Sequence, residues 1–218
     1  MRQITLALLL VAAAAPACAE SGKPLSAIIT HESNSVGNDG VTRDSHYQER
    51  LVRDAGNVWI ERILPRNHRH DTEEKEHKHL DVAEAAQHYR RDPSGSAQLM
   101  LVLQEEKVAV HMQEADVEMT GFSKCWPCVY SMTLPDALND MKITRRDGDL
   151  VWYERHGPRN TVRIQWDTKN RIARQLETRA SDGSSWSRTT LSLQKIPAVL
   201  PWTQYGKFTL KDYSDFGD

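Results

Sequence analysis

The sequence predicts a mostly β protein in which an antiparallel meander forms either a sandwich or a curved, half-barrel-like sheet. Two observations lead to this fold class. Short runs rich in Val, Ile, Thr, Tyr and Trp recur along the chain, and clusters of turn residues separate them. The links in the C-terminal half are also short, and only antiparallel neighbours can be joined so briefly.

The expected strands are bounded by recognisable turns. Asp54–Asn57 and Gln104–Lys107 each connect two runs as a hairpin, and Asp147–Asp149 starts a series of such links in the C-terminal half. The strands that we expect are 26–32, 47–53, 58–64, 98–103, 108–112, 142–146, 150–155, 161–166, 171–179 and 186–194. The tail from Ile196 is rich in Pro, Gly and aromatic residues, and we expect it to pack irregularly over a sheet edge.

Helical periodicity is scarce, and we expect one short helix at about 82–91. Asp81 is a candidate N-cap, the alanines that follow favour helix, and Asp92-Pro93 would end it. A short helical turn is also possible at Pro135–Met141.

One hairpin pattern occurs twice. Arg-Asp-x-x-x-Val-Trp-x-Glu-Arg-x-x-Pro begins at Arg53 and again at Arg146. In both copies, Trp and Glu share one face of the predicted strand, while Val and Arg share the other. The repeat suggests either a duplicated hairpin or a shared strand preference.

The first 19 residues have the pattern of a secretory signal peptide. Arg2 precedes an apolar run of about a dozen residues, which is shorter than the ~20 residues of a membrane-spanning helix. Small residues then allow cleavage after Ala19. We therefore expect a single periplasmic domain at 20–218 with no integral membrane segment after cleavage. Lipid attachment at Cys18 is the alternative.

The composition of the chain limits the classes of partner that we expect it to bind. The chain has 28 Lys and Arg residues against 30 Asp and Glu residues, and no basic block. This balance argues against nucleic acid as a partner. No nucleophile elbow, phosphate loop or His-Glu-x-x-His zinc motif occurs, so we expect a binding protein rather than an enzyme.

Clustered histidines are the most unusual feature. Two His-x-His pairs, His68/His70 and His77/His79, flank four acidic residues, and His88 follows. In extended backbone each pair presents two imidazoles to one side, and imidazole suits Cu(II) or Zn(II). These five histidines are the candidate metal ligands. A solvated surface loop is the alternative interpretation, and His31, His46, His111 and His156 are interpreted singly as sheet residues.

Cys125 and Cys128 form a Cys-x-x-Cys pair, which an oxidising compartment favours as a disulfide. A thiol oxidoreductase is disfavoured because the residues after Cys128 are interpreted as strand or loop rather than helix. A soft Cu(I) site that includes Met119 or Met132 is the remaining alternative.

Two functions remain open. The first is a periplasmic metal-binding or metal-handling protein for Cu or Zn. The second is a metal-free carrier or regulatory module that holds an apolar ligand or a protein segment on a curved sheet bearing Trp59, Trp152, Trp166 and Trp186. A weaker option is an accessory subunit of a periplasmic redox system. No motif identifies a known family.

Overall fold

A computed structural model describes residues 23–37, 39–64 and 84–216. Its strands form one sheet of twelve strands in the order β12-β6-β5-β4-β3-β2-β1-β11-β10-β9-β8-β7. Neighbouring strands are antiparallel, except that β12 runs parallel to β6. The mostly β prediction is confirmed, as is the C-terminal meander from β7 to β11. The sandwich alternative is wrong, because all twelve strands belong to one open sheet.

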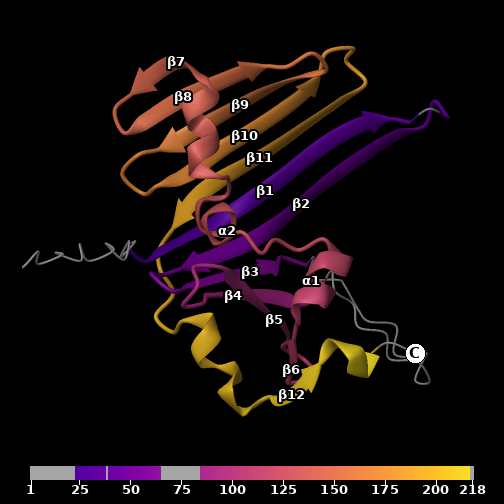
Figure 1. The fold of residues 1–218 in the computed structure, drawn as a ribbon, viewed down its shortest axis with the longest axis vertical. Coiled ribbons are helices and arrows are strands. Elements are labelled where there is room, and N and C mark those ends of the chain that lie inside the picture. The colour runs from indigo at the N-terminus through magenta and orange to yellow at the C-terminus, as the bar shows by residue number, and fades with distance from the viewer. Residues whose placement is uncertain (1–22, 38, 65–83, 217–218) are drawn as a thin grey trace, which may run out of the picture.

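The central strand β1 joins two meanders, since it pairs with β2 on one side and with β11 on the other (Figure 1). The strands are β1 Leu25–Val36, β2 Thr42–Arg53, β3 Asn57–Arg62, β4 Ala86–Arg91, β5 Ala97–Leu103, β6 Val108–His111, β7 Lys142–Asp147, β8 Leu150–His156, β9 Asn160–Asp167, β10 Ile172–Ala180, β11 Ser185–Gln194 and β12 Thr209–Asp212. All but β4 and β12 were expected from the sequence.

The helix expected at about 82–91 is wrong, because Ala86–Arg91 forms strand β4 between β3 and β5. Ala86 and His88 are buried on one face of the sheet and Tyr89 on the other. Helix propensity is a weak local preference that tertiary pairing overrides. Here the two neighbouring strands supply both the hydrogen bonds and the burial.

Both α-helices and one 3-10 helix of the described residues lie in the segment that leads from β6, next to one edge strand, to β7 at the opposite edge of the sheet. Because the chain must cross the sheet, α1 Glu114–Thr120, α2 Trp126–Ser131 and the 3-10 helix η1 Pro135–Asp140 cover one face of it (Figure 1). Only η1 was expected. We call the covered side the helix face.

The main core lies between the helix face and these helices. Leu51, Val58 and Leu101 are fully buried there, and Val117 of α1 and Trp126 of α2 pack in the same cluster. A smaller cluster forms under η1. Burial of this apolar surface holds α1 and α2 in place, because helices of six or seven residues are marginal on their own.

The opposite face carries a second apolar layer. Val52, Trp59 and Val102 follow the core residues of β2, β3 and β5 by one position, so their side chains point away from the helices. They pack against residues 195–208, which we call the C-terminal arm and which includes η2 Pro201–Thr203 and η3 Tyr205–Lys207.

Beyond the arm, β12 pairs along β6, and η4 Tyr213–Phe216 follows. The expectation that the whole tail packs irregularly over a sheet edge is therefore wrong, because the arm covers a face of the sheet and β12 then extends its edge as a regular strand.

Candidate functional site: a cavity under the C-terminal arm

A cavity of about 630 Å³ lies between the sheet and the C-terminal arm. Strands β1, β2, β3 and β5 supply its floor, and the arm with the end of β11 supplies its roof. Its lining residues are Ser26, Ile28, Arg50, Trp59, Glu61, Val102, Gln104, Gln194, Lys195, Pro197, Val199, Pro201, Gln204, Tyr205 and Phe208. More than half of them are apolar or aromatic.

The polar part of the floor centres on Glu61. Its carboxylate accepts hydrogen bonds from the Arg50 guanidinium at 2.5 Å, the Trp59 indole N–H at 2.9 Å and the Gln104 amide at 2.9 Å. Glu61 is largely buried, and Arg50 is half exposed. Three donors to one carboxylate hold this part of the floor in a fixed arrangement and neutralise the charge of Glu61.

The apolar part of the floor is formed by one side chain from each of three strands. Ile28 on β1, Trp59 on β3 and Val102 on β5 all point to the arm side, and Val199 and Phe208 of the arm belong to the same cavity lining. Trp59 is almost entirely buried. The cavity lining therefore combines apolar residues with a polar group, as ligand sites commonly do, and its accessible surface is more polar than apolar.

His88 anchors the arm to the sheet. Its Nδ1 is hydrogen-bonded to the Tyr205 hydroxyl, and its Nε2 lies 2.9 Å from Asn57 Oδ1. The Trp202 ring stacks on its imidazole with centroids 5.9 Å apart. Burial, with a smaller contribution from Arg90, lowers the pKa of His88 to about 4. The neutral imidazole therefore donates to Asn57 and accepts from Tyr205.

The structure places only His88 of the five candidate metal ligands. His68, His70, His77 and His79 lie outside the described residues, so their convergence stays a prediction. Both nitrogens of His88 are occupied by protein groups. Across the described ranges, no three His, Cys, Asp or Glu side chains gather into a metal-binding group.

Each of the other described histidines lies near one carboxylate. His31 is 2.8 Å from Glu49, His46 is 3.8 Å from Glu32, His111 is 3.6 Å from Asp212 and His156 is 2.6 Å from Glu154. They are sheet residues, as the sequence indicated.

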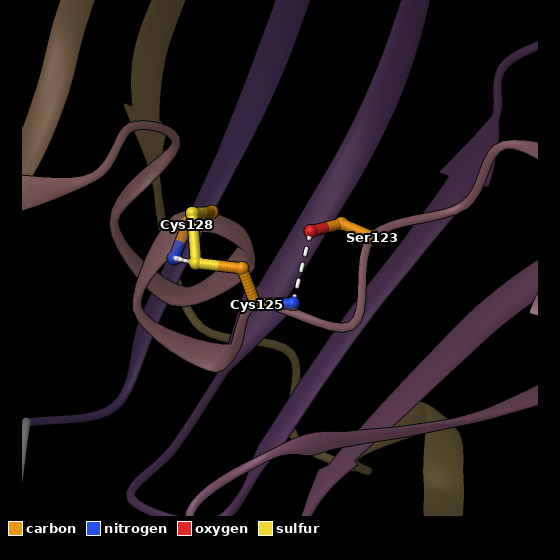
Figure 2. Close-up of a disulfide and its surroundings, with 3 residues drawn as sticks. All are labelled: Ser123, Cys125 and Cys128. Carbon is orange, nitrogen blue, oxygen red and sulfur yellow. Dashed lines mark hydrogen bonds between the residues drawn. A yellow bond between two sulfur atoms is a disulfide. The ribbon is translucent and has the colours of Figure 1, made fainter. Parts of the chain in front are cut away.

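Cys125 and Cys128 form the expected disulfide (Figure 2). The backbone N–H of Cys128 donates to Cys125 Sγ at 3.2 Å, and that of Cys125 donates to the Ser123 hydroxyl at 3.2 Å. The expectation of strand or loop after Cys128 is wrong, because Cys125 is the N-cap of α2. With both sulfurs in the disulfide, neither is a thiolate ligand for Cu(I).

Sequence reasoning identified one cavity residue, Trp59, among four tryptophans assigned to a ligand-holding sheet. Trp166 is instead buried under η1, and Trp152 and Trp186 lie outside the cavity lining. The arm residues were missed as a ligand wall. Their aromatic content, Trp202, Tyr205 and Phe208, was the available signal, because exposed tails seldom carry so many aromatic side chains.

Comparisons with known proteins identify no family. No family model matches the chain, and no curated protein matches it either. Among helices in the described part, none is long and apolar enough to cross a membrane.

Solved structures match the chain at low similarity. A PNGF-II structure is 12% identical over 88% of this chain, with a TM-score of 0.41, and the match spans 33% of that longer chain. An uncharacterised conserved protein from Thermus thermophilus is 7% identical over 88% of this chain and 91% of its own, with a TM-score of 0.43.

A putative outer membrane lipoprotein-sorting protein domain from Vibrio parahaemolyticus is 11% identical over 84% of this chain and 89% of its own, with a TM-score of 0.36. At such identities and TM-scores, these similarities carry no inference about ligand or partner.

Proposed function

We propose that this protein is an exported binding module that holds a small amphipathic ligand in the cavity between its sheet and its C-terminal arm. The observation that carries this proposal is the cavity itself. Its volume, about 630 Å³, lies within the range of roughly 300–1,000 Å³ that is common for small-molecule sites. Export rests on the predicted signal peptide at 1–19, which lies outside the described residues.

The construction of the cavity supports reversible binding. Its floor is part of a hydrogen-bonded sheet, whereas its roof is an arm without strand pairing between Lys195 and Phe208. The arm contacts the sheet mainly through Tyr205, Trp202 and Phe208. A rigid floor preorganises the site, and an irregular roof gives a ligand a route of entry.

The arm does not fill the space above the sheet. Its aromatic side chains pack around His88 and Trp59, and the cavity remains beside them. This arrangement favours the carrier interpretation of the sequence, because a sheet face filled by its own tail would leave a ligand no room.

A cavity-filling variant tests the proposal. The probe is N-phenyl-1-naphthylamine, an uncharged apolar fluorophore. Ile28→Trp places a large ring in the cavity, and Thr30→Trp is a matched control two residues along the same strand and face, outside the lining. We expect the wild type and Thr30→Trp to bind the probe alike, and Ile28→Trp to bind at least tenfold more weakly.

Circular dichroism confirms the fold of each variant. Wild-type protein that is folded but does not bind the probe contradicts the proposal, as does unchanged binding by Ile28→Trp.

We propose a separate metal site on sequence grounds alone. His68, His70, His77 and His79 would bind Cu(II) or Zn(II) through imidazole nitrogens. Calorimetric titration of chelator-stripped protein is the direct measurement. A His77→Ala/His79→Ala variant that keeps wild-type affinity for both metals would rule out the assignment.

A further inference from the structure

The cavity lining has more positively charged than negatively charged side chains. Arg50, Glu61 and Lys195 are the charged lining residues. Arg50 and Glu61 form an ion pair at 2.5 Å, so their charges cancel locally. The charge that remains is the ammonium of Lys195.

Lys195 occupies a defined place at the cavity. It directly follows Gln194, the last residue of β11, and it is the first residue of the arm. Because Gln194 pairs with Ser26 of β1, the start of the arm is fixed to the sheet at this point. Among the described residues, no carboxylate forms an ion pair with Lys195, and the side chain is exposed to solvent.

Neutral hydrogen-bond donors lie in the same lining, and two of them are on the arm or next to it. Gln194 and Gln204 contribute side-chain amides, each of which can donate hydrogen bonds. An ammonium together with two amides favours a group that accepts hydrogen bonds and carries negative charge. The same lining includes the apolar residues Ile28, Trp59, Val102, Val199 and Phe208, which we call the apolar wall.

We infer that the ligand is an amphiphile with an anionic head group, a carboxylate or a phosphate on an apolar chain. The head group contacts Lys195, and the chain lies along the apolar wall. This inference rests on the proposed function and adds the ligand's charge to it. A cationic amphiphile of the same length is disfavoured, because its head group meets an ammonium that no described carboxylate offsets.

Ligands that differ only in the head group provide the test. Decanoate, decyl phosphate, decanol and decyltrimethylammonium are titrated against the full chain below their micellar concentrations. The wild type is expected to bind decanoate or decyl phosphate about tenfold more tightly than decanol, and decyltrimethylammonium most weakly. Whichever anion binds more tightly identifies the head group as carboxylate or phosphate.

Charge variants then locate the effect. Lys195→Gln is expected to remove the preference for the anions, and Lys195→Glu to reverse it in favour of decyltrimethylammonium. Lys169→Glu, the same charge change at an exposed site in the β9–β10 turn, should behave as the wild type does. The anion preference of the wild type should weaken as salt is added, because the head-group contact is exposed to screening.

The two proposals fail in different ways. If the decyl ligands bind with equal affinity to the wild type and to Lys195→Glu, the charge inference is overturned while the ligand cavity stands. If the folded wild type binds neither the uncharged fluorophore nor any decyl ligand, the proposed function itself is overturned.

Discussion

The guanidinium of Arg53, at the end of β2, donates a hydrogen bond to the backbone carbonyl of Tyr130 in α2. It also donates to the carbonyl of Asn170 in the β9–β10 turn and lies 4.0 Å from the centre of the Tyr130 ring. Arg53 is 1% exposed, and burial lowers its pKa to about 10, so it remains charged at neutral pH. One side chain thus joins both meanders to the helix face.

Replacing Arg53 with Met should lower the free energy of unfolding by about 3 kcal/mol, because two carbonyls lose a charged donor inside the protein. Urea unfolding followed by circular dichroism measures the change. Arg146→Met is the matched control, since Arg146 begins the second copy of the hairpin pattern but is exposed, and it should cost less than about 0.5 kcal/mol. Equal stability of the two variants would contradict the role of Arg53.

Stability should fall in mild acid because of His88. Its pKa is lowered to about 4 in the folded protein, against about 6.5 for an unperturbed histidine, so the unfolded chain binds the extra proton between these values. The neutral His88 therefore contributes its full stabilisation above about pH 6.5, and this stabilisation is lost as the pH falls toward 4. By pH 5 the free energy of unfolding should have fallen by about 2 kcal/mol.

Urea unfolding at pH 7.5 and at pH 5 measures this loss. His88→Gln should lose less stability across the same interval, whereas His156→Gln, at an exposed site beside Glu154, should follow the wild type. A His88→Gln variant with the full wild-type pH dependence would show that other groups cause it.

Much of the sheet could be predicted from the sequence, because residues close together in the chain determine its hairpins. Turn residues such as Asp54–Asn57 fix a hairpin within a few positions, and alternating apolar side chains show which face is buried. Strand β4 was missed because its alanines favour helix locally, while its neighbours in space, β3 and β5, determine its conformation. Helix α2 was missed for the same reason, since burial of Trp126 and Val129 stabilises it.

The cavity could not be predicted from local patterns. Ile28 and Val199 face the same space although 171 positions separate them in the chain. Nothing in the sequence between them indicates which of the two faces of the sheet the tail covers. The pairing of β11 with β1 fixes where the arm begins, and contacts with side chains of β2, β3 and β5 hold it on this face. The ion pair of Arg50 and Glu61 is local by contrast, because the Asp54–Asn57 turn sets the register of β2 against β3.

Glu177 links two arginines across neighbouring strands. Its carboxylate lies 3.3 Å from Arg163 on β9 and 3.1 Å from Arg188 on β11, and the Gln175 amide donates to it at 2.7 Å. Glu177→Gln should lower the free energy of unfolding by about 1 kcal/mol, a modest value because both arginines are partly exposed. Thermal unfolding at low and high salt measures it, with a smaller difference between the variant and the wild type expected at high salt.

Asp147→Asn is the control for Glu177, since the pair of Asp147 with Arg145 at 3.0 Å is exposed on both sides. It should change stability by less than about 0.5 kcal/mol. If Glu177→Gln is as mild as this control, the central position of Glu177 between two arginines contributes nothing measurable.

The disulfide should contribute modestly to stability and leave the fold unchanged when it is absent. It closes a loop from Cys125 to Cys128, and the loop-entropy relation for four residues gives about 2 kcal/mol. Helix α2 has other attachments, because Trp126, Val129 and Tyr130 are buried and Arg53 holds its last turn. A Cys125→Ser/Cys128→Ser variant should therefore unfold at lower urea concentration with an unchanged m-value.

Added reductant should destabilise the wild type by a similar amount and leave that variant unaffected. A variant that loses its near-ultraviolet circular dichroism would show that α2 depends on the disulfide for its packing. In that case the apolar contacts of Trp126 and Val129 would be insufficient to hold α2 on the sheet without the closed first turn that the disulfide gives the helix.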